Sequence, residues 1–193
     1  MALKVVILGG SAGSLDVLLE VLPAIKSTKL FSYIIVLHRK ESPHNDILTR
    51  LLASKCSIQV KEVEDKEKIY ADQIYIAPAG YHLFIEKDAS FSLDVSEKVN
   101  YSRPSIDVSF SMAAEAFHKD LIGILLSGAN ADGTQGLHQI KHYGGVCIAQ
   151  DPQTTRIPNM PEFAIKSGVI DFICTPQEIK ILLENPQAFL SQK

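Results

Sequence analysis

Short apolar runs rich in β-branched residues recur along the chain, and residues at helical spacing follow them. The clearest runs are KVVIL at residues 4–8, FSYIIVL at 31–37 and LIGILL at 121–126. Such runs are typical of strands buried on both faces, as in a parallel sheet. The first fifty-odd residues read as strand, helix, strand, helix, which indicates a right-handed crossover unit. The sequence therefore predicts a doubly wound α/β fold of Rossmann-like type, with a mostly parallel sheet flanked by helices.

The middle of the chain departs from this alternation. Two short alternating segments, 81–85 and 90–95, are joined by the polar turn Lys87-Asp88 and predict an antiparallel hairpin inserted into the fold. We expect one domain over residues 1–193. Further strands are predicted at 74–77, where Pro78 stops the strand, at 146–149 and at 169–173. Further helices are predicted at 42–52, 104–118, around 137–140, from about 161 and at 176–183.

Capping residues and prolines set several expected helix boundaries. Ser14 is a candidate N-cap for the first helix, which Pro23 should shorten or kink. Ser42-Pro43 is a start signal for the second helix. Residues 175–178 (TPQE) fit a capping box with proline at the first helical position. These signals place the helices between the strands, as a doubly wound fold requires.

Composition excludes several classes of protein. The chain of 193 residues is 46% hydrophobic and 21% charged, which is ordinary for a globular domain, and its net charge of −3 gives no electrostatic footprint for nucleic acid. No apolar run reaches the roughly 18 residues that span a bilayer. Three widely spaced cysteines, Cys56, Cys147 and Cys174, suggest reduced thiols. We expect a cytoplasmic protein with neither a nucleic-acid partner nor membrane insertion.

Polar residues that could take part in catalysis follow three of the predicted strands. Ser11 follows the first strand, His38 the second and Asp132 the run at 121–126. Ligands of open parallel sheets bind beyond the carboxyl ends of the strands. The three side chains are therefore expected to meet at one edge of the sheet.

The glycine-rich segment GGSAGS at residues 9–14 has two interpretations. It could cradle a phosphate at a helix N-terminus, although Ser11 and Ser14 replace two glycines of the dinucleotide fingerprint and the lysine of a Walker loop is absent. Alternatively, residues 9–13 match Gly-x-Ser-x-Gly, a tight turn that exposes a nucleophilic serine. His38 would then be the general base and Asp132 would orient it. The Asp132-Gly133 pair also fits an ordinary turn, so both interpretations stay open here.

The remaining histidines give weaker signals. His138 and His142 are four residues apart on a predicted helix and could form a metal pair, but they lack the zincin glutamate, so a solvated helix face is favoured. His44, His82 and His118 have no evident partners.

Several short motifs, in order along nearly the whole chain, resemble the catalytic domain of the CheB chemotaxis methylesterases. By this resemblance Ser11 is the nucleophile, His38 the base and Asp132 its orienting acid. Backbone N–H groups near Ala12 and Gly13 would stabilise the oxyanion, and Arg103 could contact the substrate helix or form an ion pair with Asp107 or a neighbouring residue. The implied mechanism needs neither a metal nor an organic cofactor. The matching segments are GGSAG at 9–13, IVLH at 35–38, APAGYH at 77–82, RPSIDV at 103–108, LLSGANADG at 125–133, AQD at 149–151 and MP at 160–161.

The resemblance implies a substrate and a partner. Members of the family hydrolyse γ-glutamyl methyl esters on the cytoplasmic helices of chemoreceptors, release methanol, and in many cases deamidate receptor glutamines. The chain departs from the family where Ala129 and Asn130 replace Met and Gly of the acid loop, which could alter the wall beside the nucleophile. No phosphorylated receiver domain precedes Ser11, so we expect a standalone catalytic domain. A binding module that has lost efficient chemistry, or a nucleotide-binding domain, are the alternatives.

Overall fold

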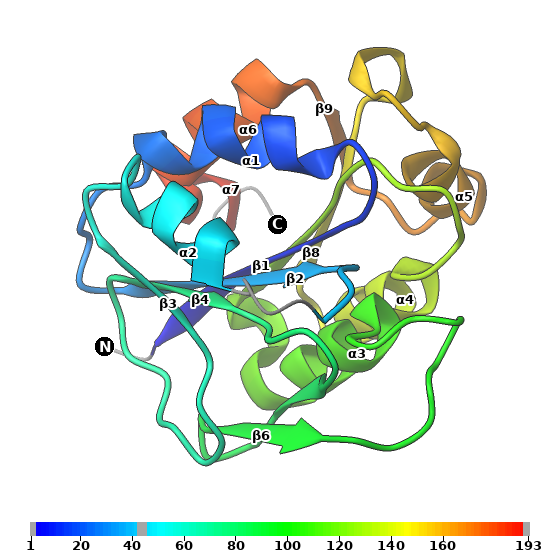
Figure 1. Cartoon of the computed structure of the whole chain (residues 1–193). Coiled ribbons are helices and arrows are strands. Elements are labelled where there is room, and N and C mark those ends of the chain that lie inside the picture. The colour runs from blue at the N-terminus through cyan, green and yellow to red at the C-terminus, as the bar shows by residue number, and fades with distance from the viewer. Residues whose placement is uncertain (1–2, 42–45, 191–193) are drawn as a thin grey trace.

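Seven parallel strands form the central sheet of the protein (Figure 1). The computed structural model describes residues 3–41 and 46–190, and within them the strand order is β3-β4-β2-β1-β7-β8-β9. The chain places β2, β3 and β4 on one side of β1 and then β7, β8 and β9 on the other side. This arrangement makes the fold doubly wound. The strands span β1 Lys4–Gly10, β2 Phe31–Leu37, β3 Gln59–Glu62, β4 Gln73–Ile76, β7 Leu121–Leu125, β8 Val146–Gln150 and β9 Phe172–Cys174.

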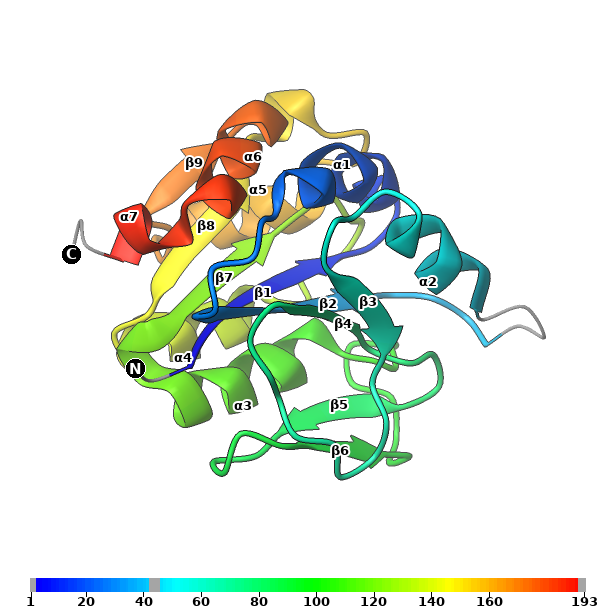
Figure 2. The same ribbon diagram turned by 90° about the vertical axis from the view of Figure 1, so that its left-hand side faces the viewer.

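Helices cover both faces of the sheet (Figures 1 and 2). α1, α2 and α6 pack on one face, and α3, α4 and α5 pack on the other. Three short 3-10 turns lie at Leu22–Ala24, His118–Asp120 and Pro152–Thr154. The helices span α1 Ser14–Val21, α2 Asp46–Ala53, α3 Ile106–Phe117, α4 Thr134–His142, α5 Asn159–Lys166, α6 Pro176–Glu184 and α7 Pro186–Leu190.

The central strands are buried on both sides, as their apolar runs predict. In β1, Val5 and Ile7 contribute to the core beneath α3 and α4, whereas Val6 and Leu8 contribute to the core beneath α1 and α6. Successive side chains of a strand point to opposite faces, so one apolar run supplies both cores. The doubly wound parallel sheet expected from the sequence is confirmed.

The predicted hairpin is present as a separate antiparallel pair, β5 (His82–Ile85) and β6 (Phe91–Asp94). It lies on the outer side of α3, at the bottom of Figure 2. Leu83, Ile85 and Phe91 join the core on that side. The insertion therefore packs against α3, and the N-terminus of this helix lies at the candidate site.

Several elements differ from the expectation or fall outside the described residues. The strand expected at 169–173 is the shorter β9, which begins only at Phe172. Gly13, not Ser14, is the N-cap of α1; its φ of 86° places it in the left-handed region, where glycine is favoured. Strand β3 was not predicted because this edge strand is mostly polar and has no apolar run. The start signal Ser42-Pro43 lies outside the described residues, whereas the Thr175–Glu178 capping box and the shortening of the first helix at Pro23 are confirmed.

We predict that Gly136→Ala destabilises the protein, because α4 lies very close to α3 at this position. A Cβ atom on Gly136 would lie 2.4 Å from Phe110 Cβ and 3.1 Å from the Asp107 carbonyl oxygen. Overpacking of this kind costs about 1–3 kcal/mol and should outweigh the gain in helix propensity. Denaturant unfolding should report the loss, and the exposed neighbour Gln135→Ala is the matched control. An unchanged free energy of unfolding in Gly136→Ala would contradict the packing described.

Candidate active site

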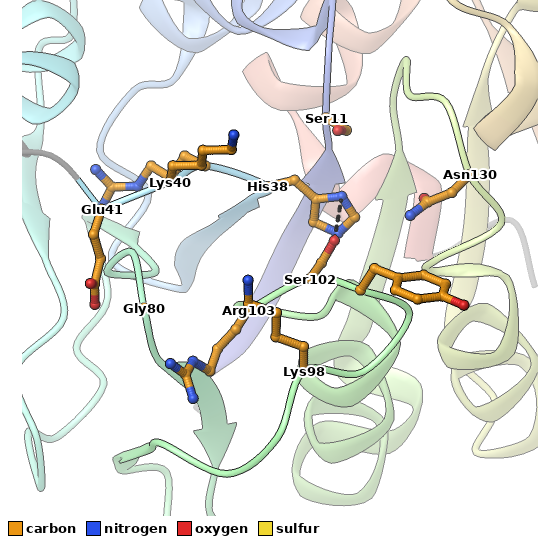
Figure 3. A pocket seen from close by; sticks show the side chains of 11 residues that line it. Ser11, His38, Lys40, Glu41, Gly80, Lys98, Ser102, Arg103 and Asn130 are labelled. Atoms are coloured by element: carbon orange, nitrogen blue, oxygen red, sulfur yellow. Dashed lines mark hydrogen bonds between the residues drawn. The ribbon is translucent and has the colours of Figure 1, made fainter.

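Ser11 lies immediately beyond β1, at the carboxyl edge of the sheet. Its N–H donates to the Ser127 carbonyl at 2.9 Å, which extends the pairing of β1 with the segment after β7. The left-handed Gly13 then turns the chain directly into α1. Neither the Ala12 nor the Gly13 N–H donates to another residue in the described part of the chain. Ser11 lines a pocket of about 500 Å³ (Figure 3).

His38 lies beside Ser11 because the two residues follow paired positions on neighbouring strands. Gly10 of β1 pairs with Leu37 of β2, and Ser11 and His38 come directly after them. The His38 N–H donates to the Gly10 carbonyl at 3.1 Å, so the pairing continues to the rim. Adjacent strands are about 4.8 Å apart, which keeps the serine and the imidazole close together. Both side chains line the same pocket.

Asp132 is buried beneath the imidazole and holds it in place. Its Oδ2 atom lies 2.7 Å from His38 Nε2. The carboxylate also caps the N-terminus of α3, where it accepts the N–H groups of Ile106 at 2.8 Å and Asp107 at 2.9 Å. The Ser105 hydroxyl and the Asn100 amide each donate to Oδ1 at 3.0 Å. The carboxylate is thus fully bonded although it is almost inaccessible to water.

The environment of Asp132 decides which nitrogen of His38 carries the proton. Burial alone would raise the pKa of this carboxyl, but the bond to His38 and the backbone N–H groups of Asp107 and Ile106 hold the pKa well below its usual value. A carboxylate only accepts hydrogen bonds, so the neutral imidazole must donate from Nε2. His38 Nδ1 is therefore the atom available as a base.

Ser102 is the residue that contacts this basic nitrogen. Its hydroxyl lies 3.2 Å from His38 Nδ1, as the dashed line in Figure 3 marks. Among the described residues no hydrogen bond joins Ser11 to His38. The expected His38–Asp132 bond is thus present, whereas the bond between Ser11 and His38 is not formed. Nδ1 has a single lone pair, so Ser102 must release it before Ser11 can use it.

The other residues singled out in the sequence have distinct places. Arg103 and Asn130 line the pocket, but Ala12, Gly13 and Ala129 are not among its lining residues in the described chain. The Arg103 guanidinium donates to the Val95 and Ser96 carbonyls at 2.6 and 2.8 Å. Asp107 instead accepts the Gly133 and Gly136 N–H groups, so the suggested ion pair between Arg103 and Asp107 is not formed.

Asn130 supports the acid loop, because its Oδ1 accepts the Asp132 N–H at 3.2 Å. Ala129, by contrast, is exposed to solvent. Gly128, rather than Ala129, lies close to Ser11: a Cβ atom on Gly128 would lie 3.1 Å from Ser11 Cβ and 2.5 Å from Met160 Cε. The Ala129 position therefore does not form the wall beside Ser11.

Sequence reasoning missed the supporting residues Asn100, Ser102 and His82. His82 is buried and, contrary to expectation, has two partners: Nδ1 accepts the Ser105 N–H at 3.2 Å and Nε2 bonds the Glu97 carbonyl at 2.9 Å. Its place in the APAGYH segment was a signal that could have identified it. Asn100 and Ser102 lie in an irregular segment with no pattern to mark them. His118 also has partners, the Ala114 carbonyl and the Tyr143 ring, and His44 lies outside the described residues.

The side chains that commonly bind metal ions are spread along the described residues. Within residues 3–41 and 46–190, no three His, Cys, Asp or Glu side chains are grouped so that they could hold a metal ion. His138 and His142 both lie on α4, and the exposed His142 ring packs edge-on against Tyr143. In the same described part of the chain, no helix has both the length and the hydropathy to cross a membrane.

A serine at the end of a parallel strand, next to an imidazole bound to a buried carboxylate, is the arrangement of α/β serine hydrolases. Residues 6–183 match the family model described as CheB methylesterase. The chain belongs to this family of methylesterases.

Similar proteins and a solved structure agree with this assignment. A relative from Leptospira interrogans, named putative protein-glutamate methylesterase/protein-glutamine glutaminase, is 40% identical over 93% of this chain and 92% of its own length. A Thermotoga maritima protein with the same name, without "putative", is 34% identical over 91% of this chain, which spans 52% of that protein. The crystal structure of the Thermotoga maritima CheB methylesterase catalytic domain is 31% identical, with a TM-score of 0.90, and the match covers 96% of this chain and 100% of that chain.

We predict that Asp107→Asn changes how stability depends on pH. Burial, together with the neighbouring Asp132, raises the pKa of Asp107 to about 6. The unfolded carboxyl has a pKa near 3.9, so the folded protein holds an extra proton between about pH 4 and pH 6. Stability should therefore fall as pH rises through this window. Asp132 has a lowered pKa and is already ionised there.

In Asp107→Asn, the fall in the free energy of unfolding between about pH 4 and pH 7 should be smaller by on the order of 1 kcal/mol. Denaturant titrations at several pH values measure it. Asp46→Asn, at an exposed position on α2, should follow the parent protein. If the free energy of unfolding of Asp107→Asn depended on pH in the same way as that of the parent, the raised pKa of Asp107 would be contradicted.

Proposed function

We propose that this protein is a protein-glutamate methylesterase that uses Ser11 as its nucleophile, His38 as general base and Asp132 as the orienting acid. The observation that supports this most directly is the 2.7 Å contact between His38 Nε2 and the buried Asp132 carboxylate, beside Ser11 on the neighbouring strand. Relatives with the corresponding name and the family membership support the choice of a glutamyl methyl ester.

The first half of the reaction forms an acyl-enzyme. His38 Nδ1 takes the proton of the Ser11 hydroxyl, and Oγ attacks the ester carbonyl carbon. Asp132 stabilises the resulting imidazolium through Nε2–H. The N–H groups of Ala12 and Gly13, which have no partner in the described chain, are suited to stabilise the oxyanion at the start of α1. Nδ1–H then protonates the departing methoxide oxygen, and methanol leaves.

The second half releases the product. His38 Nδ1 takes a proton from water, the resulting hydroxide attacks the acyl carbon, and Ser11 Oγ leaves with the proton returned by the imidazolium. The product is a glutamate side chain. With a glutamine side chain as substrate the same steps would release ammonia, which is the deamidation named for the relatives. We propose methylated cytoplasmic helices of chemoreceptors as the partner, and hence the cytoplasm as the location.

The decisive test is Ser11→Ala, assayed by methanol release from a methyl-esterified receptor fragment. The nucleophile is lost while the backbone turn is retained, so turnover should fall by at least about 1,000-fold with circular dichroism unchanged. Ser54→Ala, at the exposed end of α2, is the matched control and should keep full activity. Undiminished turnover by a folded Ser11→Ala variant would refute the nucleophile assignment. Receptor binding without turnover by the parent protein would favour a non-catalytic module.

A second prediction follows from the contact between Ser102 and His38. Because Ser102 occupies the lone pair that Ser11 needs, Ser102→Ala should accelerate the reaction of Ser11 with a fluorophosphonate probe about fivefold, the equivalent of one hydrogen bond of ~1 kcal/mol. Ser102→Thr retains the hydroxyl and should react like the parent. Equal labelling rates for all three proteins would show that Ser102 does not restrain the base.

A further inference from the structure

The pocket that contains Ser11 is strongly basic although the whole chain carries a net charge of −3. Four cationic side chains line it, Arg39, Lys40, Lys98 and Arg103, against the single carboxylate of Glu41. Such a concentration of one charge sign in a concave site attracts ligands of the opposite sign. The charge is local to the pocket and is not a property of the chain as a whole.

The two arginines are engaged by the protein itself. Arg39 forms an ion pair with Glu62 and also donates to the Ala77 carbonyl. Arg103 donates to the carbonyls of Val95 and Ser96. Their charges contribute to the field, but their geometry is set by bonds that hold the pocket wall together.

The two lysines, by contrast, have no such role in the fold. Lys40 and Lys98 are exposed, and neither forms an ion pair or hydrogen bond with any residue in the ranges 3–41 and 46–190. They come from different segments, Lys40 from the chain after β2 and Lys98 from the irregular segment between β6 and α3. Figure 3 shows both around the pocket that holds His38 and Ser11.

We infer that Lys40 and Lys98 are specificity-determining residues that select ester-bearing protein segments with carboxylates on the residues flanking the ester. The inference rests on the proposed methylesterase function and adds a substrate class to it. The ester itself is uncharged, so the attraction must come from its neighbours. Lys40 follows His38 by two residues, and Lys98 lies on the segment that carries Ser102. Both lysines therefore line the pocket in which the ester would meet Ser11.

The size of the effect follows from the exposure of the two ammonium groups. Exposed ion pairs are weak, and each lysine should contribute a factor of about two to five in affinity. Together they should give a preference of about tenfold at low salt. At high salt the preference should shrink, because screening shortens the range of exposed charges to about 3 Å near 1 M.

The test uses two synthetic helical peptides that carry one γ-glutamyl methyl ester and differ only in whether the flanking residues are Glu or Gln. For the parent protein, kcat/KM for methanol release should be about tenfold higher with the Glu peptide at low salt. In the double variant Lys40→Gln/Lys98→Gln the kcat/KM values for the two peptides should be equal. Lys26→Gln/Lys119→Gln, exposed positions that precede β2 and β7 at the opposite edge of the sheet, should keep the preference.

Binding separates this inference from the proposed function. The affinity of Ser11→Ala for both uncleaved peptides, measured by fluorescence anisotropy, reports the charge preference without turnover. Equal affinities, or a preference that persists in the lysine double variant, would overturn the inference. Failure of the parent protein to release methanol from either peptide would refute the methylesterase function, whereas the binding preference would still be measured.

Discussion

The buried carboxylate of Asp132 at the N-terminus of α3 is the interaction on which the site depends. It satisfies helix N–H groups that would otherwise lack partners, and through the same oxygens it orients His38. The bond to His38 and the N–H groups of Asp107 and Ile106 keep the pKa of the carboxyl low, and the ionised carboxylate fixes the tautomer of the imidazole. One anion therefore joins two halves of the doubly wound sheet, because His38 follows β2 on one side of β1 and Asp132 follows β7 on the other.

The sequence predicted the sheet, and the meeting of Ser11, His38 and Asp132 at its carboxyl edge, for a simple reason. Ser11, His38 and Asp132 each follow an apolar run, and the carboxyl ends of parallel strands meet at one edge. The supporting residues could not be found in this way. Asn100 and Ser102 lie in an irregular segment whose position depends on packing against the hairpin and α3, and no local pattern encodes that packing. The edge strand β3 was missed because a strand at the rim of a sheet needs little apolar surface.

Ala129 and Asn130, the two residues expected to depart from the family pattern, have distinct places in the structure. Ala129 is exposed, whereas Gly128 lies close to Ser11 and Met160. Asn130 bonds the backbone of Asp132 and so takes part in holding the acid loop. Of the two positions, only Asn130 supports the carboxylate that orients His38.

His82 gives the inserted hairpin a role beyond packing. His82 is the first residue of β5. Its imidazole accepts the Ser105 N–H at the start of α3 and bonds the Glu97 carbonyl in the preceding segment. The core residues of the hairpin hold it against α3, so His82 fixes the start of the helix whose N–H groups bind Asp132. The inserted hairpin is therefore linked through α3 to the carboxylate that orients His38.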